Sequence, residues 1–223
     1  MPASRHLKLF RNFLICASVR FGISEMSNHR RTEITTPSGV GANKQAALDV
    51  DADKRAAFAG IVRLFRIWLA LPRQKKRRDI DPIALGADLL PHICLGHFLG
   101  NGTDFRYDLI GSEIASLAPR LAPGSLASDT LRIQGTDHDH ILSLFLQTGI
   151  SQRPRIHEIR YNSVDGVPLR VFSAYLPLGL NPDRVCAEDL MLAVWRTKVT
   201  ETIAKDSSVD LTGEFLQFSG ITI

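Results

Sequence analysis

The chain has 223 residues, of which 44% are hydrophobic and 22% are charged, and these values are typical of a globular protein with one core of ordinary size. Its net charge of +4 comes from the amino terminus. Residues 1–31 hold six basic groups and one acidic group, whereas the other 192 residues hold 21 basic and 22 acidic groups. Because the body is nearly neutral, the overall charge gives no reason to expect a nucleic-acid partner.

Cysteine content and hydropathy argue against several further classes of protein. Cys16, Cys94 and Cys186 are odd in number and form no CxxC pair, which argues against a disulfide framework or a zinc site and favours a reducing cytoplasm. No apolar run approaches the roughly 20 residues that span a bilayer, so we expect no membrane partner. The short apolar run at residues 13–19 is a poor signal-peptide core, because Arg20 and Phe21 follow where small residues should stand.

We expect residues 1–50 to form a disordered or extended lead-in, since residues 27–50 are rich in Ser, Thr, Gly and Asn and lack periodicity. Residues 51–78 are expected to form an amino-terminal helix followed by a basic linker. The helix shows apolar residues at helical spacing: Phe58, Ile61, Val62, Phe65, Trp68 and Leu69. This apolar stripe has to pack against another surface. A second copy of the chain, forming a homodimer through residues 58–69, is one candidate.

Five cations in six residues follow at residues 73–78. Such a run could bind an anion, a nucleic acid or an acidic protein, or it could be a solvated linker. No aromatic residues interleave to stack on bases, and Asp79 and Asp81 follow at once. The composition therefore favours the linker.

The stretch around residues 79–111 predicts a helix followed by a β-hairpin. Asp81 and Pro82 are a good helix start, since Asp caps the first turn and Pro suits the first helical position. Alternating apolar residues predict strands at 93–99 and 105–109. The intervening residues, 100–104, tolerate the positive φ angles of a tight turn.

Residues 112–150 predict helices and loops. Ser112 is placed to cap a short helix at 113–117, residues 121–129 are expected to form an irregular loop, and Thr136 with Asp139 forms a capping box for a helix that ends at Gly149. The run Asp137, His138, Asp139 and His140 suggests metal ligands. Consecutive helical residues point about 100° apart, however, so helix-start chemistry is the better interpretation.

The carboxyl-terminal part is rich in predicted strands. Residues 156–163 and 167–178 flank an Asp165-Gly166 turn, a third strand covers 189–196, and a short strand is possible near 215–218. Two early and three late strands predict an α+β fold, with a five-stranded antiparallel sheet, helices on one face, and the additional amino-terminal helix. That is the layout of a PAS domain. Residues 197–223 form a tail without an assigned role.

The chain also resembles a PAS-like family found chiefly in alphaproteobacterial proteins. The matching pieces are WLALP at residues 68–72, RDIDP at 78–82, LLPHI at 89–93, FRYDLIG at 105–111 and LPL at 176–178. The chain departs from the family pattern at Asp108 and Ser112, where the family carries Arg and Thr. The resemblance covers about residues 55–196 and implies a PAS-like domain at 79–196. It further implies a sensory or ligand-binding module in the cytoplasm, without enzymatic activity.

Candidate cavity-wall residues are the aromatic or polar-tipped side chains of the predicted sheet: His97, Phe105, Tyr107, Phe172, Tyr175 and Trp195. The alternative is that they are ordinary core residues, since Tyr and Trp are often buried with one hydrogen bond. No catalytic nucleophile or acid–base pair is evident. The ligand and any cofactor stay unspecified: haem through His97 or His157 is possible, and flavin photochemistry lacks its usual cysteine context. A small-molecule sensor ranks above an interaction module, and both rank above an enzyme.

Overall fold

The computed structural model describes residues 40–117, 121–133, 138–163, 166–199, 203–204 and 206–222. The two compact units of the chain are residues 1–39 and 40–223, and only the second contains described residues. Its helices are α1 (Val40–Ala70), η1 (Arg77–Asp79), α2 (Pro82–Leu89), η2 (Leu90–His92), α3 (Ser112–Leu117), α4 (Ala127–Ile133), α5 (His138–Ser151) and α6 (Thr212–Ser219). Its strands are β1 (Ile93–Leu99), β2 (Asp104–Ile110), β3 (Arg155–Asn162), β4 (Pro168–Leu178), β5 (Asp189–Lys198) and β6 (Ser207–Asp210).

One antiparallel sheet contains all of the described strands, in the order β2-β1-β5-β4-β3-β6. The expected α+β fold and the joining of two early strands with three late ones are therefore confirmed. The strand number was wrong, because β6 adds a sixth strand beside β3. The longest pairing joins β4 and β5 from Leu169 opposite Lys198 to Leu178 opposite Asp189.

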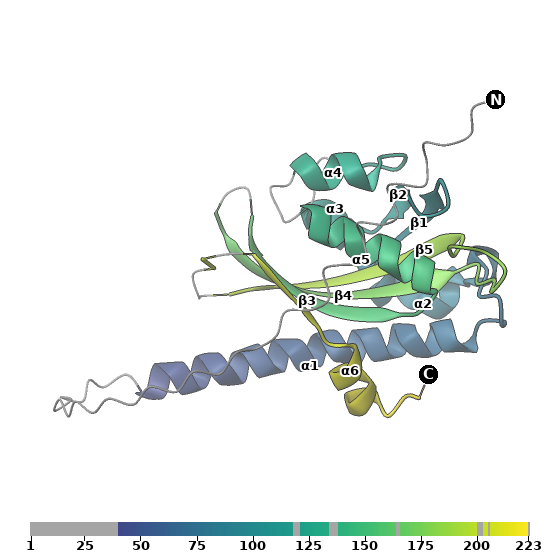
Figure 1. Cartoon of the computed structure of the whole chain (residues 1–223). Coiled ribbons are helices and arrows are strands. Elements are labelled where there is room, and N and C mark those ends of the chain that lie inside the picture. The colour runs from purple at the N-terminus through teal and green to yellow at the C-terminus, as the bar shows by residue number, and fades with distance from the viewer. Residues whose placement is uncertain are drawn as a thin grey trace, which may run out of the picture. The chain divides into compact units, whose positions relative to one another are not determined.

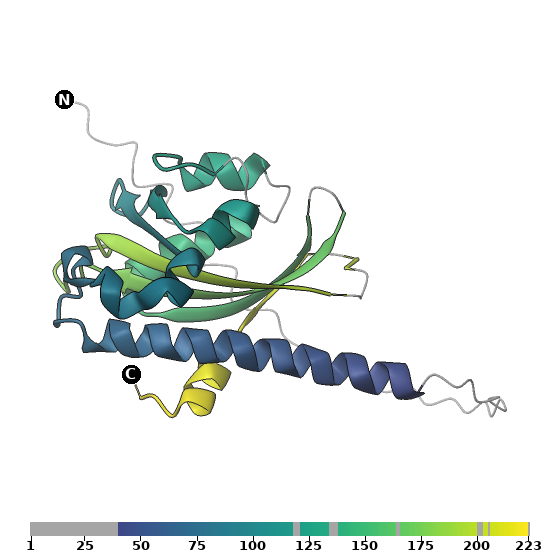
Figure 2. The ribbon, with the colours of Figure 1, turned by 180° about the vertical axis from the view of Figure 1, so that it is seen from behind.

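Helices cover both faces of the sheet, and not one face as predicted (Figure 1). The "α1 face" packs against α1, α2 and α6, and its sheet residues include Ile156, Phe172 and Met191. The "α5 face" packs against α3, α4 and α5, and its sheet residues include Phe105 and Tyr175. Figure 2 shows the same two layers from behind. The sheet is therefore a shared wall between two separate apolar clusters.

Helix α1 begins at Val40, well before the predicted start near Asp51. Four of the six residues of its predicted apolar stripe pack on the sheet of the same chain, since Phe58, Ile61, Phe65 and Trp68 are all at most 4% exposed, whereas Leu69 is 37% exposed. A homodimer through residues 58–69 would have to pull these side chains away from the sheet. The homodimer stays a prediction, and the four buried residues give it no support.

The end of the chain differs from the sequence-based expectation. A strand was predicted near residues 215–218, but α6 covers them and the strand β6 lies earlier. The Asp210 carboxylate accepts a hydrogen bond from the backbone N–H of Thr212, the first residue of α6, at 2.8 Å. Phe215 then lies fully buried against Phe58 and Phe65, with ring centroids 5.6 and 5.4 Å apart.

Local signals around the first hairpin are largely confirmed. The Asp81 carboxylate accepts from the Ile83 N–H at 2.8 Å, with Pro82 in the first turn.

The predicted loop at 121–129 is wrong at its end, because α4 already begins at Ala127. Helix α5 passes Gly149 and ends at Ser151, followed by Gln152 with a φ of 52°.

The basic run at residues 73–78 is more ordered than a solvated linker. It contains the start of η1 at Arg77. Lys75 Nζ donates to the Trp68 carbonyl oxygen at 2.8 Å and lies 4.4 Å from the centroid of that indole ring. The backbone of Gln74 and Lys75 accepts hydrogen bonds from Leu180 and Gly179. The run is therefore tied to the end of β4.

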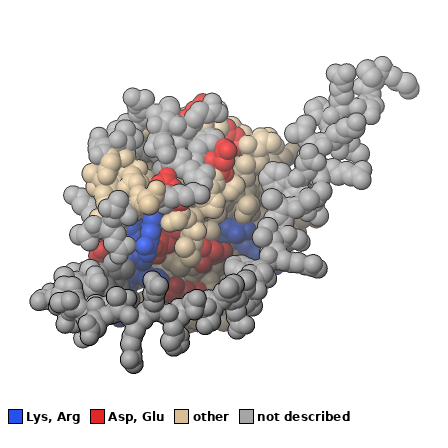
Figure 3. Space-filling view, turned by 60° about the vertical axis from the view of Figure 1, so that its left-hand side comes forward, with Lys and Arg blue, Asp and Glu red and all other residues tan. Residues whose placement is uncertain are grey.

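The surface charge of the described residues agrees with the nearly neutral composition of the chain outside residues 1–31. In the side seen in Figure 3, the described basic and acidic side chains are interspersed and do not form a patch of one sign. Within the described residues, no helix combines the length and the hydropathy needed to cross a bilayer.

Candidate functional site

Three of the six predicted site residues come together on the α5 face. Phe105 and Tyr107 of β2 contact Phe145 of α5, with ring centroids 5.2 and 6.2 Å apart, and Tyr175 of β4 lies 5.6 Å from the same ring. The four rings are at most 3% exposed. They meet because side chains along a strand alternate between the two faces of the sheet, and all three strand residues fall on the same face.

The other three residues lie on the α1 face. Phe172 packs edge-on against Phe58 of α1, with a centroid distance of 6.3 Å. The Trp195 ring stacks on His92 at 5.1 Å and borders Gly60 of α1. His97 bonds to Asp108 at the end of the sheet near β2. The six residues therefore do not form one wall, because strand alternation sends Phe172 and Tyr175 to opposite faces.

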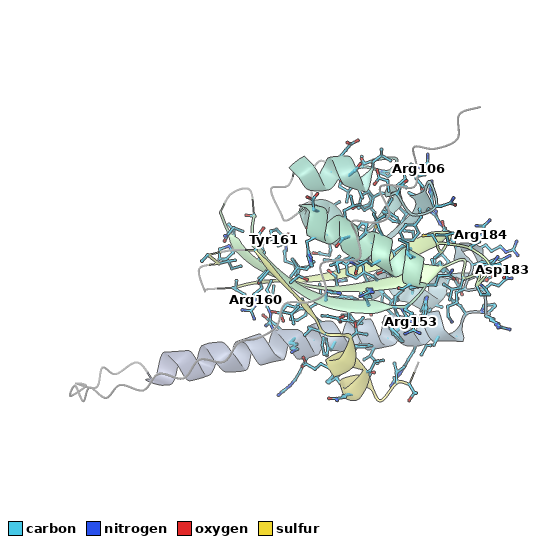
Figure 4. The ribbon with its side chains drawn as sticks, in the orientation of Figure 1. Arg106, Arg153, Arg160, Tyr161, Asp183 and Arg184 are labelled. Carbon is cyan, nitrogen blue, oxygen red and sulfur yellow. The ribbon has the colours of Figure 1, made fainter. Side chains whose placement is uncertain are left out.

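The same alternation is visible at two neighbouring residues of β3. Arg160 bonds to Glu158 on the α1 face, whereas Tyr161 packs against the apolar cluster of the α5 face (Figure 4). Sequence analysis did not single out either residue. The polar residues of β3 are nonetheless distributed between two chemically different surroundings.

The α5 face carries several buried polar atoms among its aromatic rings. Tyr107 shares a hydrogen bond with Thr130 of α4, and Tyr175 shares one with Ser173. Burial raises the pKa of both phenols well above the ordinary value, so both hydroxyls stay protonated at physiological pH. A protonated phenol can donate or accept a hydrogen bond, which gives this face polar contacts for a guest.

Histidine and arginine side chains of β3 extend these polar contacts toward β6. His157 is 5% exposed. Its Nδ1 lies 3.3 Å from the Ser208 hydroxyl oxygen of β6, and its ring lies 6.0 Å from that of Tyr175. Arg155 precedes it on the same face of β3, opposite Tyr175. The sequence did not indicate that Arg155 and His157 lie on a covered face of the sheet, because charged residues on a strand usually mark its solvated side.

An ion-pair cluster lies on the α1 side of the first hairpin. The Asp108 carboxylate accepts from Arg77 Nη1 at 2.6 Å, and its contact with His97 Nδ1 is 2.8 Å long. Burial raises the pKa of Asp108, but the hydrogen bonds from His97 and Arg77 outweigh it and hold the pKa below its usual value. Burial also raises the pKa of the nearby Asp189. This cluster ties η1 to the hairpin.

Neither described cysteine is set up as a nucleophile. Cys94 and Cys186 are free and buried. Burial raises the pKa of Cys94 to about 12 and that of Cys186 to about 11, so the reactive thiolate is scarce at neutral pH. Across the described residues, no group of three or more His, Cys, Asp or Glu side chains could hold a metal ion. In the run of candidate ligands, Asp137 and the His138 side chain lie outside the described residues.

Comparisons of the chain with protein-family models, with curated proteins and with solved structures give no match.

Proposed function

We propose that the chain is a PAS-like sensory module that binds a small molecule on the α5 face and has no catalytic activity of its own. The early hairpin lies beside the last long strand β5, with α3, α4 and α5 inserted between β2 and β3. This arrangement supports the family resemblance carried by residues 68–111. The two free, buried cysteines suit a cytoplasmic sensor.

One observation carries the proposal: the α5 face is an apolar aromatic cluster that contains polar tips. A core that serves only stability gains little from buried hydroxyl and imidazole groups, because each costs free energy when its hydrogen bonds are incomplete. Ligand sites, by contrast, combine mostly apolar walls with a few placed polar groups. Tyr107, Thr130, Ser173, Tyr175 and His157 supply such groups here, and of these five His157 has a buried nitrogen, Nε2, without a hydrogen-bond partner among the described residues.

Native mass spectrometry of the full chain purified from its own host tests the proposal. We expect a second mass above that of the bare chain, which disappears on denaturation. Tyr107→Phe and Tyr175→Phe remove one hydroxyl each and should weaken retention of the guest. Trp195→Phe on the α1 face is the matched control and should leave retention unchanged. Recovery of only the bare chain would contradict the proposal.

A further inference from the structure

Two nitrogen-bearing side chains, the guanidinium of Arg155 and the imidazole of His157, lie next to each other on the α5 face of β3. Arg155 is paired across the sheet with Tyr175. His157 is paired with Ser173 of β4 on one side and with Asp210 of β6 on the other. Residues two apart on a strand point to the same face, about 7 Å apart. The two nitrogen-bearing groups therefore face the same region, between β6 and the sheet side of α5.

Both side chains have a buried nitrogen whose hydrogen-bonding capacity is unused. Among the described residues, Arg155 Nε and His157 Nε2 are shielded from solvent and have no hydrogen-bond partner. The Arg155 guanidinium also makes no ion pair within the described part of the chain. An unpaired buried donor costs about 1–3 kcal/mol. Arg155 Nε is always a donor, and His157 Nε2 is a donor in the tautomer or protonated form that carries its proton there, so the two side by side call for an acceptor.

The titratable and charged groups around His157 come from three elements: Asp210 from β6, Arg155 from its own strand and His140 from α5. The neutral Ser208 hydroxyl of β6 lies 3.3 Å from His157 Nδ1. Asp210 is the nearby anion, but its carboxylate is already engaged by Thr212 at the start of α6. The anion nearest to Arg155 and His157 is therefore already hydrogen-bonded elsewhere, and it leaves their two unbonded nitrogens without an acceptor.

We propose that Arg155 and His157 bind the carboxylate of a small organic acid at the junction of β3, β6 and α5. One carboxylate oxygen can accept from each of the two unused nitrogens, provided that the His157 tautomer or its protonated form carries a proton on Nε2. The rings of Tyr175 and Phe145 lie alongside and suit an apolar body of the acid. A phosphate dianion fits less well, because Asp210 would repel a second negative charge more strongly.

Binding of this kind is coupled to a proton. Burial lowers the pKa of His157, and the charges of Arg155 and His140 lower it further, while Asp210 opposes them. A bound carboxylate adds a negative charge beside the ring and favours the protonated form. The complex thus takes up a proton, and the affinity should be higher at pH 6 than at pH 8.

The test is a titration of the full chain with sodium acetate, sodium benzoate or inorganic phosphate, with sodium chloride holding the ionic strength constant. Calorimetry gives the dissociation constant, and the ¹⁵N shift of His157 Nε2 reports on the site itself. We expect saturable binding of the two carboxylates, tighter for benzoate. Arg155→Gln should weaken it about tenfold or more, and Arg155→Lys should restore part of the loss.

Two further variants separate binding from structure. His157→Gln keeps an N–H donor near the position of Nε2 but cannot gain a proton, so we expect binding that no longer depends on pH. Arg153→Gln removes an exposed neighbouring charge and is the matched control, expected to bind like the wild type (Figure 4). Unchanged circular dichroism and Tm verify that each variant folds.

The inference deepens the proposed function and rests on it, yet the two can fail separately. It is overturned if no carboxylate gives a saturable shift, if Arg155→Gln binds as tightly as the wild type, or if phosphate binds more tightly than both acids. A retained guest without an acidic group in native mass spectrometry would also overturn it while leaving the sensory proposal standing. Loss of both retention and acid binding would remove the two together.

Discussion

Asp108 joins three segments of the chain through one carboxylate. Arg77 reaches it from η1 and His97 from β1, while Arg106 Nε lies 3.8 Å from its other oxygen. An Arg in place of Asp108 could not accept from Arg77. Asp108 and Arg77, the fifth residue of the 73–78 run, are therefore two halves of one contact.

Replacing Asp108 by Asn tests the strength of this contact through pH. The pKa of Asp108 is lower in the folded chain than its unfolded value of about 3.9. The stabilisation is then complete above about pH 4 and is lost as the pH falls through the folded value. We expect Asp108→Asn to lower the free energy of unfolding by about 1–2 kcal/mol at pH 7.

Urea denaturation between pH 7 and pH 3 measures this difference. The gap between wild type and Asp108→Asn should narrow below pH 4. The exposed Asp183 provides the control, and Asp183→Asn should change stability little at any pH. A gap that stays constant down to pH 3 would show that the charge of Asp108 is not involved.

A second charged pair, Glu158 with Arg170, is buried on the α1 face. The side chains are 6% and 4% exposed and 2.8 Å apart. Burial raises the pKa of Glu158, but hydrogen bonds from Arg170 and Arg160 outweigh it and lower the pKa. Removing one partner of a buried pair leaves the other charge poorly compensated.

Glu158→Gln should therefore destabilise the fold by roughly 3 kcal/mol in urea denaturation. The double change Glu158→Leu with Arg170→Met should cost less than the two single changes together, because it removes both charges. Arg160 bonds to the same carboxylate but is 40% exposed, so Arg160→Gln should cost less than about 1 kcal/mol. Additive losses in the double variant would mean that the two side chains act independently.

At the scale of elements, the hairpin of β1 and β2 depends on one close approach. The pairing register shifts between Leu95 and Gly96. A Cβ on Gly96 would collide with the backbone carbonyl oxygen of Arg106 and with the ring of Phe105. A glycine is therefore needed where the strand bulges onto its neighbour.

Gly96→Ala should destabilise the chain by about 1–3 kcal/mol, because the strands have to separate to admit the methyl group. Thermal unfolding followed by circular dichroism measures the change. Gly213 in α6 is the matched glycine, since a Cβ there meets nothing within 4 Å. Gly213→Ala should be neutral or stabilising by up to about 1 kcal/mol. Equal stability of the two variants would contradict the proposed close approach.

At the scale of the whole unit, the sequence predicted the strands well and their surroundings poorly. Period-two alternation located β1 and β2, whose partners and turn are local. It could not say that helices cover both faces. In β4 all residues from Leu169 to Leu178 are buried, as in a strand covered on both faces, but Arg170 and Ser173 interrupt its apolar run and conceal this in the sequence.

The candidate site was harder to predict, because contacts between distant residues decide it. Arg77 and Asp108 are 31 residues apart, and no periodicity connects them. Counting aromatic residues grouped Phe172 with Tyr175, although their spacing of three along a strand sends them to opposite faces. Parity along each strand would have separated them. The burial of Arg155 and His157 depends on β6 and α5, and no local pattern in the sequence indicates it.

The docking of α6 on α1 has a consequence for the order in which the unit folds. Lys54 and Glu214, which lie 160 residues apart, form an ion pair beside the buried Phe215. Contacts across so long a loop form late, after hairpins such as β3–β4. Phe215→Ala should then speed unfolding while leaving the refolding rate nearly unchanged, a φ-value of about 0–0.3, which stopped-flow fluorescence would measure. Slower refolding of this variant would instead put the contact in the nucleus. If so, the unfolding rate of the native state depends on a helix that docks only after the folding barrier has been crossed.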